Sequence, residues 1–406
     1  MNPIPSRRPR AGLLATAFTA AGVALGTSGA VLFGSGVLPP APAAAAPLTL
    51  QAPVEMPSFA DVVERVRPAV VSVRVRGQAV AARDGEGGAR PGAGRMPDIS
   101  PDHPLYEFFR GFGDIDPREN RPGPRGPRGP RGAASQGSGF FVSADGLIVT
   151  NNHVVQGARE VEILTDDGRT LSARVVGTDP RTDLAVLRVD SDEVFPYVAF
   201  ASGRSRIGDW VVAIGNPFGL GGSVTAGIVS AESRDIGAGP YDDFIQIDAP
   251  INRGNSGGPT FNLRGEVVGV NTAIYSPSGG NVGIAFAIPA HVAVDVAGQL
   301  AEAGEVTRGF LGVQVQAVTR EIAEAIGLPS ARGALIAEPQ RGTPADRAGL
   351  RSGDVIVAVD GAPIADHREL TRRIAAIAPG TRVPITIVRR GGPRDVAVEI
   401  GRLPGN

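Results

Sequence analysis

The chain has 406 residues, a length that predicts two or three domains. Hydrophobic residues make up 42% and charged residues 20%, as in ordinary globular proteins, which argues against a wholly disordered chain. The absence of cysteine excludes disulfides, thiol nucleophiles and cysteine-based metal sites, and four histidines leave little material for a histidine metal site. A formal net charge of −1 gives no general attraction to nucleic acid, so we expect no nucleic-acid partner.

Residues 1–46 have the pattern of an export signal. Three arginines precede the uncharged residues 11–38, and the small residues at 41–46 resemble a cleavage site. The uncharged stretch is longer than the core of a usual signal peptide and long enough to cross a bilayer. A cleaved signal peptide and a retained membrane anchor are therefore both open, and either one predicts an exported protein.

A first strand and a long polar insert come next. Residues 68–75 alternate in hydrophobicity, as in a half-buried strand. Residues 77–136 are rich in Gly, Pro, Arg and Asp and predict a flexible insert. An apolar island interrupts the insert, with large side chains at Leu105, Tyr106, Phe108 and Phe109. Two interpretations of the island remain open: local packing on its own domain, and docking into a partner subunit.

Short strands follow in quick succession after residue 136. The sequence predicts them at 139–142, 147–149, 160–164, 173–176, 184–189, 210–214 and 265–270. Turns separate these strands without intervening helices, a spacing that predicts an antiparallel barrel or sandwich. A helix is predicted over residues 291–303, with Gly304 after its end, and a second folded unit follows from about residue 308.

Three residues at predicted strand ends have the chemistry of a serine nucleophile with its base and orienting acid. Ser256 lies in the segment GNSGGP, where glycines admit a substrate backbone and successive N–H groups can face a developing oxyanion. His153 follows one strand and Asp183 begins another. The order His, Asp, Ser is that of chymotrypsin-type barrels, so we predict these three residues to be catalytic.

The pattern GxSxG around Ser256 also marks the nucleophile of α/β-hydrolases. Asp360 and His367 would then complete the order Ser, Asp, His. That site needs a strand before the serine and a helix after it. The residues that follow here are Gly-Gly-Pro, which oppose a helix. The chymotrypsin-type order is therefore favoured.

The motifs TNNHVV, TDLAVL and GNSGGP, in this order, resemble the HtrA/Deg family of serine proteases. The segments SGFFV at 138–142, GNPFG at 215–219 and GIAFAIP at 283–289 also match. The resemblance implies a mostly β fold, a chymotrypsin-like double β-barrel over residues 57–300, and no metal or other cofactor. It further implies site roles for residues around the nucleophile: oxyanion-hole residues Gly254, Asn255 and Ser256, pocket walls Ile251 and Ile274, and a regulatory Arg234. The aliphatic pocket walls suggest small side chains such as Val or Ala as substrates.

The second unit, residues 308–404, resembles one PDZ domain, most characteristically in TPADRAGLRSGDVI at 343–356. The loop and strand that would capture a peptide C-terminus are Phe310, Leu311, Gly312 and Val313. A helix over residues 369–378 would line the groove. In such a site the peptide adds to the sheet as an extra strand.

The resemblance implies an ATP-independent serine endoprotease of the periplasm or cell envelope that degrades unfolded or damaged proteins. It also implies a homotrimer or larger assembly, in which the family's matching insert reaches a neighbouring subunit's active site. Two alternatives remain open. One is a membrane-anchored protease that cuts a signalling substrate, and the other is a PDZ-bearing holdase or scaffold with secondary protease activity.

Overall fold

The computed structural model describes residues 58–75, 103, 105–109, 136–217, 222–277, 280–390 and 392–404. The predicted signal or anchor at 1–46 and most of the predicted insert at 77–136 lie outside the described residues. Across the part of the chain that is described, the helices are too short or too polar for any to cross a membrane.

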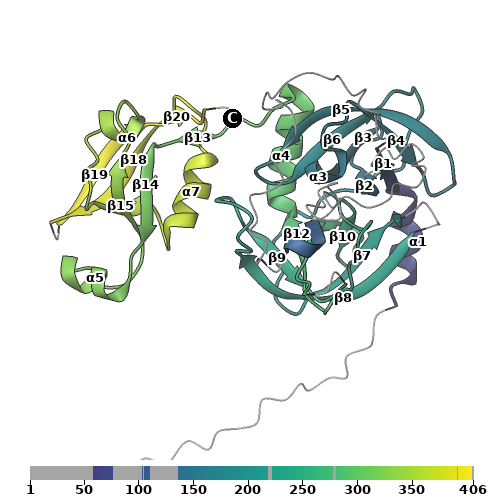
Figure 1. The fold of residues 1–406 in the computed structure, drawn as a ribbon, viewed down its shortest axis with the longest axis horizontal. Helices are drawn as coiled ribbons and strands as arrows, with labels where there is room; N and C mark the ends of the chain where they lie inside the picture. Colours follow the sequence, from purple (N-terminus) through teal and green to yellow (C-terminus); the bar gives the residue numbers. More distant parts are fainter. Residues whose placement is uncertain are drawn as a thin grey trace, which may run out of the picture. The chain divides into compact units, whose positions relative to one another are not determined.

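The first closed barrel is built from strands of the N-terminal half of the described chain (Figure 1). Its strands follow the spatial order β1-β2-β3-β6-β5-β4, and each neighbouring pair is antiparallel. The bounds are β1 (Val70–Arg74), β2 (Gln136–Phe141), β3 (Leu147–Asn151), β4 (Glu160–Leu164), β5 (Thr170–Asp179) and β6 (Leu184–Val189). The strands predicted at 160–164 and 184–189 are thus found with the same bounds.

The second closed barrel has the order β10-β11-β12-β9-β8-β7 and is also antiparallel throughout. Its strands are β7 (Trp210–Gly215), β8 (Ser223–Arg234), β9 (Phe244–Ile247), β10 (Pro259–Phe261), β11 (Val267–Ile274) and β12 (Ala285–Pro289). Every residue of β11 is buried, although alternate side chains of a strand face opposite sides. The reason is that α4 (Ala290–Ala303) covers its outer side.

Helix α4 also contacts β5 and β6 of the first barrel, so it packs on both barrels. It ends at Gly304, which has a positive φ of 74°, as the sequence predicted. The remaining helical segments before it are short. They are α1 (Ala60–Val66), the 3₁₀ helix η1 (Arg67–Ala69), α2 (Tyr106–Phe109) and α3 (Asn152–Val155).

The apolar island of the insert packs on its own domain. Leu105 and Phe108 are 1% and 0% exposed and belong to the same core cluster as Phe140 and Phe261. Helix α2 contacts strand β11. Local packing is therefore the correct interpretation for these two side chains, and the interpretation that they dock into a partner subunit is wrong. The sequence could not decide between the two because nothing local specifies the surface that covers an apolar turn.

The C-terminal unit has a separate core, centred on Ile336, Ile356 and Ile385. Its sheet has the order β14-β15-β16-β18-β19, with β17 beside β16, and a small pair joins β13 to β20. The strands are β13 (Gly309–Phe310), β14 (Val313–Ala317), β15 (Ala334–Pro339), β16 (Val355–Val359), β17 (Ala362–Pro363), β18 (Arg382–Arg389), β19 (Gly392–Glu399) and β20 (Gly401–Arg402). The helices are α5 (Arg320–Ile326), α6 (Pro344–Arg347) and α7 (His367–Ala375).

The burial of Phe108 predicts a large stability effect. Phe108→Ala should reduce the free energy of unfolding of the protease part by about 3–5 kcal/mol, because it empties a closed core site. Tyr106→Ala, at a half-buried position of the same turn, should cost clearly less. Denaturant midpoints, measured in the Ser256→Ala background to prevent self-digestion, check this. A changed particle mass in light scattering at unchanged stability would instead restore the docking interpretation.

Candidate active site

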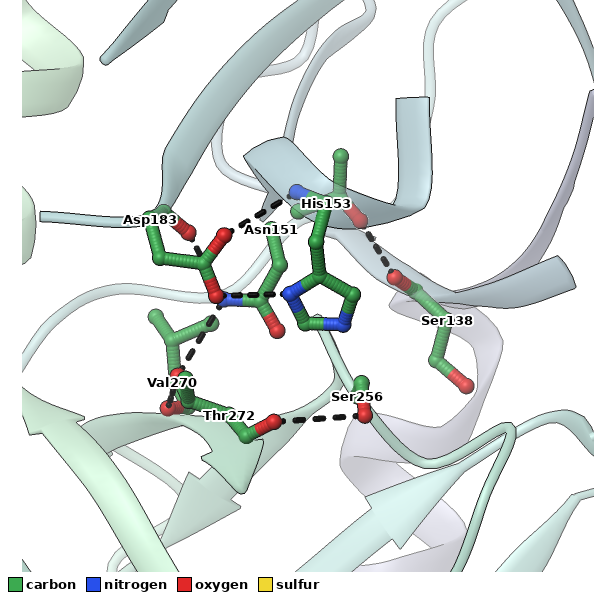
Figure 2. Close-up of polar contacts among 8 residues, drawn as sticks. Ser138, Asn151, His153, Asp183, Ser256, Val270 and Thr272 are labelled. Carbon is green, nitrogen blue, oxygen red and sulfur yellow. Dashed lines mark hydrogen bonds and ion pairs between the residues drawn. The ribbon is translucent and has the colours of Figure 1, made fainter. Parts of the chain in front are cut away.

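His153 and Asp183 meet where two neighbouring strands end. His153 lies in α3, directly after β3, and Asp183 directly precedes β6. The register pairs Asn151 with Leu184, which brings the two side chains together. Asp183 Oδ2 lies 2.7 Å from His153 Nδ1, and Oδ1 accepts the backbone N–H of His153 at 3.0 Å (Figure 2). The carboxylate therefore fixes the imidazole orientation, with Nε2 as the ring nitrogen that faces away from Asp183.

The backbone of Asp183 is strained. Its φ is +57°, in the left-handed region that non-glycine residues seldom adopt. Two donors hold its carbonyl oxygen: the Asn152 N–H at 3.1 Å and Asn151 Nδ2 at 2.9 Å. Such strain persists where surrounding contacts over-determine the conformation, and it is concentrated at functional sites.

Ser256 lies in a turn before β10 and is fully buried. Its hydroxyl donates to the Thr272 carbonyl at 3.4 Å, near the limit of hydrogen bonding. The His153 ring lies between Asp183 and Ser256 in Figure 2. The structure thus gathers all three predicted residues at one place, with His153 and Asp183 from the first barrel and Ser256 from the second.

Two glycines give the Ser256 turn its shape. Gly254 and Gly257 have φ values of +95° and +83°. A Cβ on Gly257 would lie 2.2 Å from the Ser138 carbonyl oxygen, so any side chain there would collide with the first barrel. The Asn255 carbonyl accepts the Gly258 N–H at 3.0 Å. Because the C=O and N–H of a trans peptide point in opposite directions, this bond turns the N–H of Ser256 away from Gly258.

The predicted pocket walls, Ile251 and Ile274, are both fully buried. Ile251 precedes the Ser256 turn, and Ile274 ends β11. Asn281 connects the two loops, because its Nδ2 donates to the Ile251 carbonyl at 3.0 Å. Tyr275 follows Ile274 and is 37% exposed. Sequence reasoning missed Asn281, whose role depends on a contact between distant loops.

Arg234 ends β8, opposite Phe244, and its Nε donates to Gln246 Oε1 at 3.0 Å. It opens the loop 235–243. Within this loop the buried Asp242 carboxylate accepts the N–H groups of Ile236 and Ala238 at 3.0 and 2.9 Å. Burial raises the pKa of Asp242 to about 6, and the neighbouring Asp235 acts in the same direction. Sequence reasoning missed Asp242, for which the acidic pair at 242–243 was the available signal.

The predicted peptide-binding residues lead directly into β14, an edge strand of the sheet in the C-terminal unit. Phe310 lies in β13, Val313 begins β14, and the linking Gly312 has a φ of +79°. Strand β14 is the last strand of its sheet, and α7 packs against β13 and β14. An edge strand beside a helix is the arrangement that accepts a peptide as an added strand. Helix α7 starts two residues before the prediction because Asp366 caps it, accepting the N–H groups of residues 368 and 369, and it ends at residue 375, three residues before the prediction.

The raised pKa of Asp242 predicts a pH effect on stability. A folded pKa of about 6 above an ordinary value of 3.8 means that the native state holds this proton more tightly than the unfolded state. The resulting stabilisation is complete below about pH 3.8 and is lost as the pH rises through about 6. Wild type should therefore lose stability relative to Asp242→Asn between about pH 4.5 and 7. Thermal unfolding at several pH values checks this, with the exposed Asp192→Asn as control. A wild-type-to-variant difference that stays constant over that range would contradict it.

Comparisons with known proteins agree with this architecture. Residues 137–270 match the trypsin-like peptidase domain family, and residues 309–400 match the PDZ domain family. A relative from Rhizobium meliloti (strain 1021), named "Probable periplasmic serine endoprotease DegP-like", is 55% identical over 367 residues. The match covers 88% of this chain and 72% of that protein. A relative of the same name from Brucella melitensis biotype 1 is 52% identical, covering 87% of this chain and 70% of that protein.

Solved structures of this kind are also similar. The HtrA-type protease AlgW with a tripeptide has a TM-score of 0.68 at 37% identity, covering 86% of this chain and 99% of that chain. A serine endoprotease from Yersinia pestis has a TM-score of 0.57 at 30% identity, covering 86% and 100%.

The predicted fold class, a chymotrypsin-like double β-barrel followed by one PDZ domain, is confirmed. The α/β-hydrolase alternative with Asp360 and His367 is wrong, because the serine lies in antiparallel barrels without the required strand-to-helix turn. The predicted periplasmic location agrees with the names of the relatives. The chain belongs to the HtrA-type family of DegP-like serine endoproteases, with a trypsin-like peptidase domain and one PDZ domain.

Proposed function

We propose that this endoprotease acts in the periplasm on unfolded or damaged proteins, without ATP, and that His153, Asp183 and Ser256 carry its chemistry. The observation that supports the assignment best is the 2.7 Å contact between Asp183 Oδ2 and His153 Nδ1, beside a buried serine on a glycine-shaped turn. The residue types, their order along the chain and their convergence all fit one mechanism.

In this mechanism Ser256 Oγ attacks the carbonyl carbon of the scissile peptide bond. His153 Nε2 takes the hydroxyl proton and later gives it to the leaving amine, and water then releases the acyl group by the same route. Asp183 stabilises the imidazolium that forms and keeps the ring in one tautomer. The weak bond from the Ser256 hydroxyl to Thr272 must be exchanged for one to His153 before the attack.

Charge develops on the carbonyl oxygen of the substrate during the attack. We assign its stabilisation to the turn at Gly254, Asn255 and Ser256, through the amides of Gly254 and Ser256. The bond from Gly258 N to the Asn255 carbonyl supports this assignment, because it turns the Ser256 amide away from Gly258 and leaves it out of that bond. We propose from the family resemblance that side chains of the substrate enter toward Ile251 and Ile274, aliphatic residues that suit small side chains such as Val or Ala.

The PDZ domain extends the proposal to protein partners. We propose that Phe310, Leu311, Gly312 and Val313 bind the C-terminus of a substrate or an activating peptide. The named function of the relatives, endoproteolysis, favours a protease over the holdase or scaffold alternative. The membrane-anchored alternative rests on residues 1–46, and sequencing the N-terminus of the purified protein decides between anchor and cleaved signal.

Three finer points stay predictions. The domain limits are proposed at 57–300 for the protease part and 308–404 for the PDZ part. A homotrimer or larger assembly is expected from the resemblance to the family. Arg234 is proposed to regulate the site from the loop that it opens, where its contact with Gln246 joins the end of β8 to β9.

Replacement of the nucleophile tests the catalytic assignment. Ser256→Ala should abolish cleavage of casein, with a loss on the order of 10⁶ in rate, because covalent catalysis is removed. His153→Ala should behave alike. Both variants should keep the thermal midpoint of the wild type within a few degrees. Casein cleavage by the alanine variant at more than a few per cent of the wild-type rate would refute the assignment.

Peptide binding tests the PDZ assignment. In the Ser256→Ala form of the full chain, a peptide with a free apolar C-terminus should bind at least about tenfold more tightly than its amide, because the carboxylate makes charge-assisted hydrogen bonds. Fluorescence anisotropy measures both affinities.

A matched pair of glycine variants locates that binding. Gly312→Ala should abolish it, because a Cβ there would lie 2.3 Å from Thr343 Cβ. Gly327→Ala introduces a side chain at a similar φ of +76° into open space and should leave affinity unchanged. Equal affinity for acid and amide, or equal behaviour of the two variants, would reject the model.

A further inference from the structure

The hydroxyl of Ser138 connects the first barrel to the turn that carries Ser256. It accepts the Asn216 N–H at 2.8 Å and donates to the Gly254 carbonyl at 2.6 Å. We propose that Ser138 is a positioning residue for the oxyanion hole, holding the 254–256 turn in the conformation that stabilises the oxyanion. The proposal rests on the proposed function, because it assumes that the amides of Gly254 and Ser256 form that hole.

Ser138 is itself held rigidly. It lies in the middle of β2, between β1 and β3, and it is fully buried. Its carbonyl accepts the Thr150 hydroxyl at 2.7 Å, and its N–H donates to the Ser256 carbonyl at 2.8 Å. Strand β2 is thus fixed in the barrel, and Ser138 donates hydrogen bonds from it to two carbonyls of the turn, those of Gly254 and Ser256.

The glycines make the backbone of this turn easy to rotate, so contacts from outside the turn help to fix its conformation. Gly254 has a φ of +95° and no side chain that could restrict its backbone. Rotation of the peptide bond after Gly254 would move its carbonyl away from Ser138 and reorient Asn255, whose own peptide carries the Ser256 amide. The hydrogen bond from the Ser138 hydroxyl opposes that rotation directly. The N–H of the same peptide, that of Asn255, donates to the Asn252 carbonyl at 3.0 Å within the turn, so the Ser138 hydroxyl holds the oxygen end of a peptide whose other end is held locally.

The other partner of the hydroxyl lies behind the turn. Asn216 follows β7 and is 2% exposed. The residues on either side of Asn216 pack closely against the same turn. A Cβ added to Gly215 would lie 2.8 Å from Asn255 Cα, and a Cβ added to Gly254 would lie 2.7 Å from Pro217 Cβ. The Ser138 hydroxyl therefore bridges two buried backbone groups of the second barrel, the Asn216 N–H and the Gly254 carbonyl. Removing the hydroxyl deprives both groups of this hydrogen-bond partner, and a buried polar group without a partner is costly in free energy. The turn can reduce that cost by changing its conformation.

The chain offers a matched control in the adjacent strand. Ser72 lies directly opposite Ser138 in the register of β1 and β2 and is also fully buried. Its hydroxyl accepts from the side chain of Gln136, a residue of the same barrel, at 3.3 Å. Ser72→Ala therefore removes a buried hydroxyl from the same part of the barrel without releasing the turn.

The experiment uses the full chain, a chromogenic peptide ending its acyl part in Val, and the corresponding peptide boronic acid. The boronate forms a tetrahedral adduct with the serine, so its affinity reports the oxyanion hole, whereas KM reports substrate binding. Ser138→Ala should lower kcat about tenfold or more, less than the loss of an oxyanion donor itself. Boronate affinity should fall by a similar factor, with KM nearly unchanged. Ser72→Ala should keep kcat and boronate affinity near wild type.

The outcomes separate the possibilities. If Ser138→Ala folds and keeps the kcat and boronate affinity of Ser72→Ala, the proposal is overturned. If Ser138→Ala fails to fold, Ser138→Cys keeps the shape with a much weaker donor and should show the same selective loss of kcat; wild-type kcat in that variant overturns the proposal. The Ser256→Ala form is assayed in parallel. Activity there would defeat the proposed catalytic assignment, whereas an inactive Ser256→Ala with a fully active Ser138→Ala defeats the role of Ser138 alone.

Discussion

The seam between the two barrels is the constraint on which the rest of the site depends. His153 and Asp183 come from the first barrel and Ser256 from the second, so their relative position is set by whatever joins the barrels. The backbone bond from the Ser138 N–H to the Ser256 carbonyl makes that join at Ser256, the proposed nucleophile. A displacement of about 1 Å between reacting groups can cost a hundredfold in rate, which gives the seam its catalytic importance.

The close approach of the two barrels at the seam explains why residue 257 is a glycine. The turn lies so near β2 that a Cβ would overlap the Ser138 carbonyl, and its φ of +83° already excludes most side chains. On the other side of the site, Asp183 adopts a left-handed backbone without being glycine. Its carboxylate contacts His153 Nδ1, a contact that glycine could not make, and the hydrogen bonds from Asn151 and Asn152 to its carbonyl offset the strain. Residue chemistry decides where the backbone strain is placed.

Much of the fold and the convergence of the three candidate catalytic residues could be predicted because their signals are local. The alternation of β4 and the apolar run of β6 indicate two strands with the bounds that the structure shows, and the turns between strands indicate an antiparallel barrel. The convergence of His153, Asp183 and Ser256 was predictable because each residue type has few chemical roles at a strand end in that order, and their catalytic roles stay a prediction. The family resemblance then suggested the neighbouring residues.

The supporting contacts could not be predicted, because each joins residues that are far apart in the chain. The Ser138 hydroxyl reaches Gly254 across 116 positions, and Asn151 reaches Thr272 across 121. A serine in a strand otherwise indicates only a polar position. For Phe108 the sequence showed that the side chain is apolar and is expected to be buried, but it did not show which surface covers it. Hydrogen-bond partners across the seam depend on how the two barrels are arranged in three dimensions, so they can be identified only from the structure.

The seam is polar although it is buried, and this has a physical consequence. Ser138, Thr150, Asn151 and Thr272 are all at most 2% exposed, and each hydrogen-bonds to another residue at or beside the site. Apolar side chains of similar volume would avoid the desolvation of these groups and could pack as stably. Apolar packing is non-directional, however, and would tolerate sliding of one barrel on the other. Satisfied buried hydrogen bonds have fixed directions and become costly when broken, so they restrict the seam to one arrangement. A site assembled from two barrels needs that restriction more than it needs additional stability.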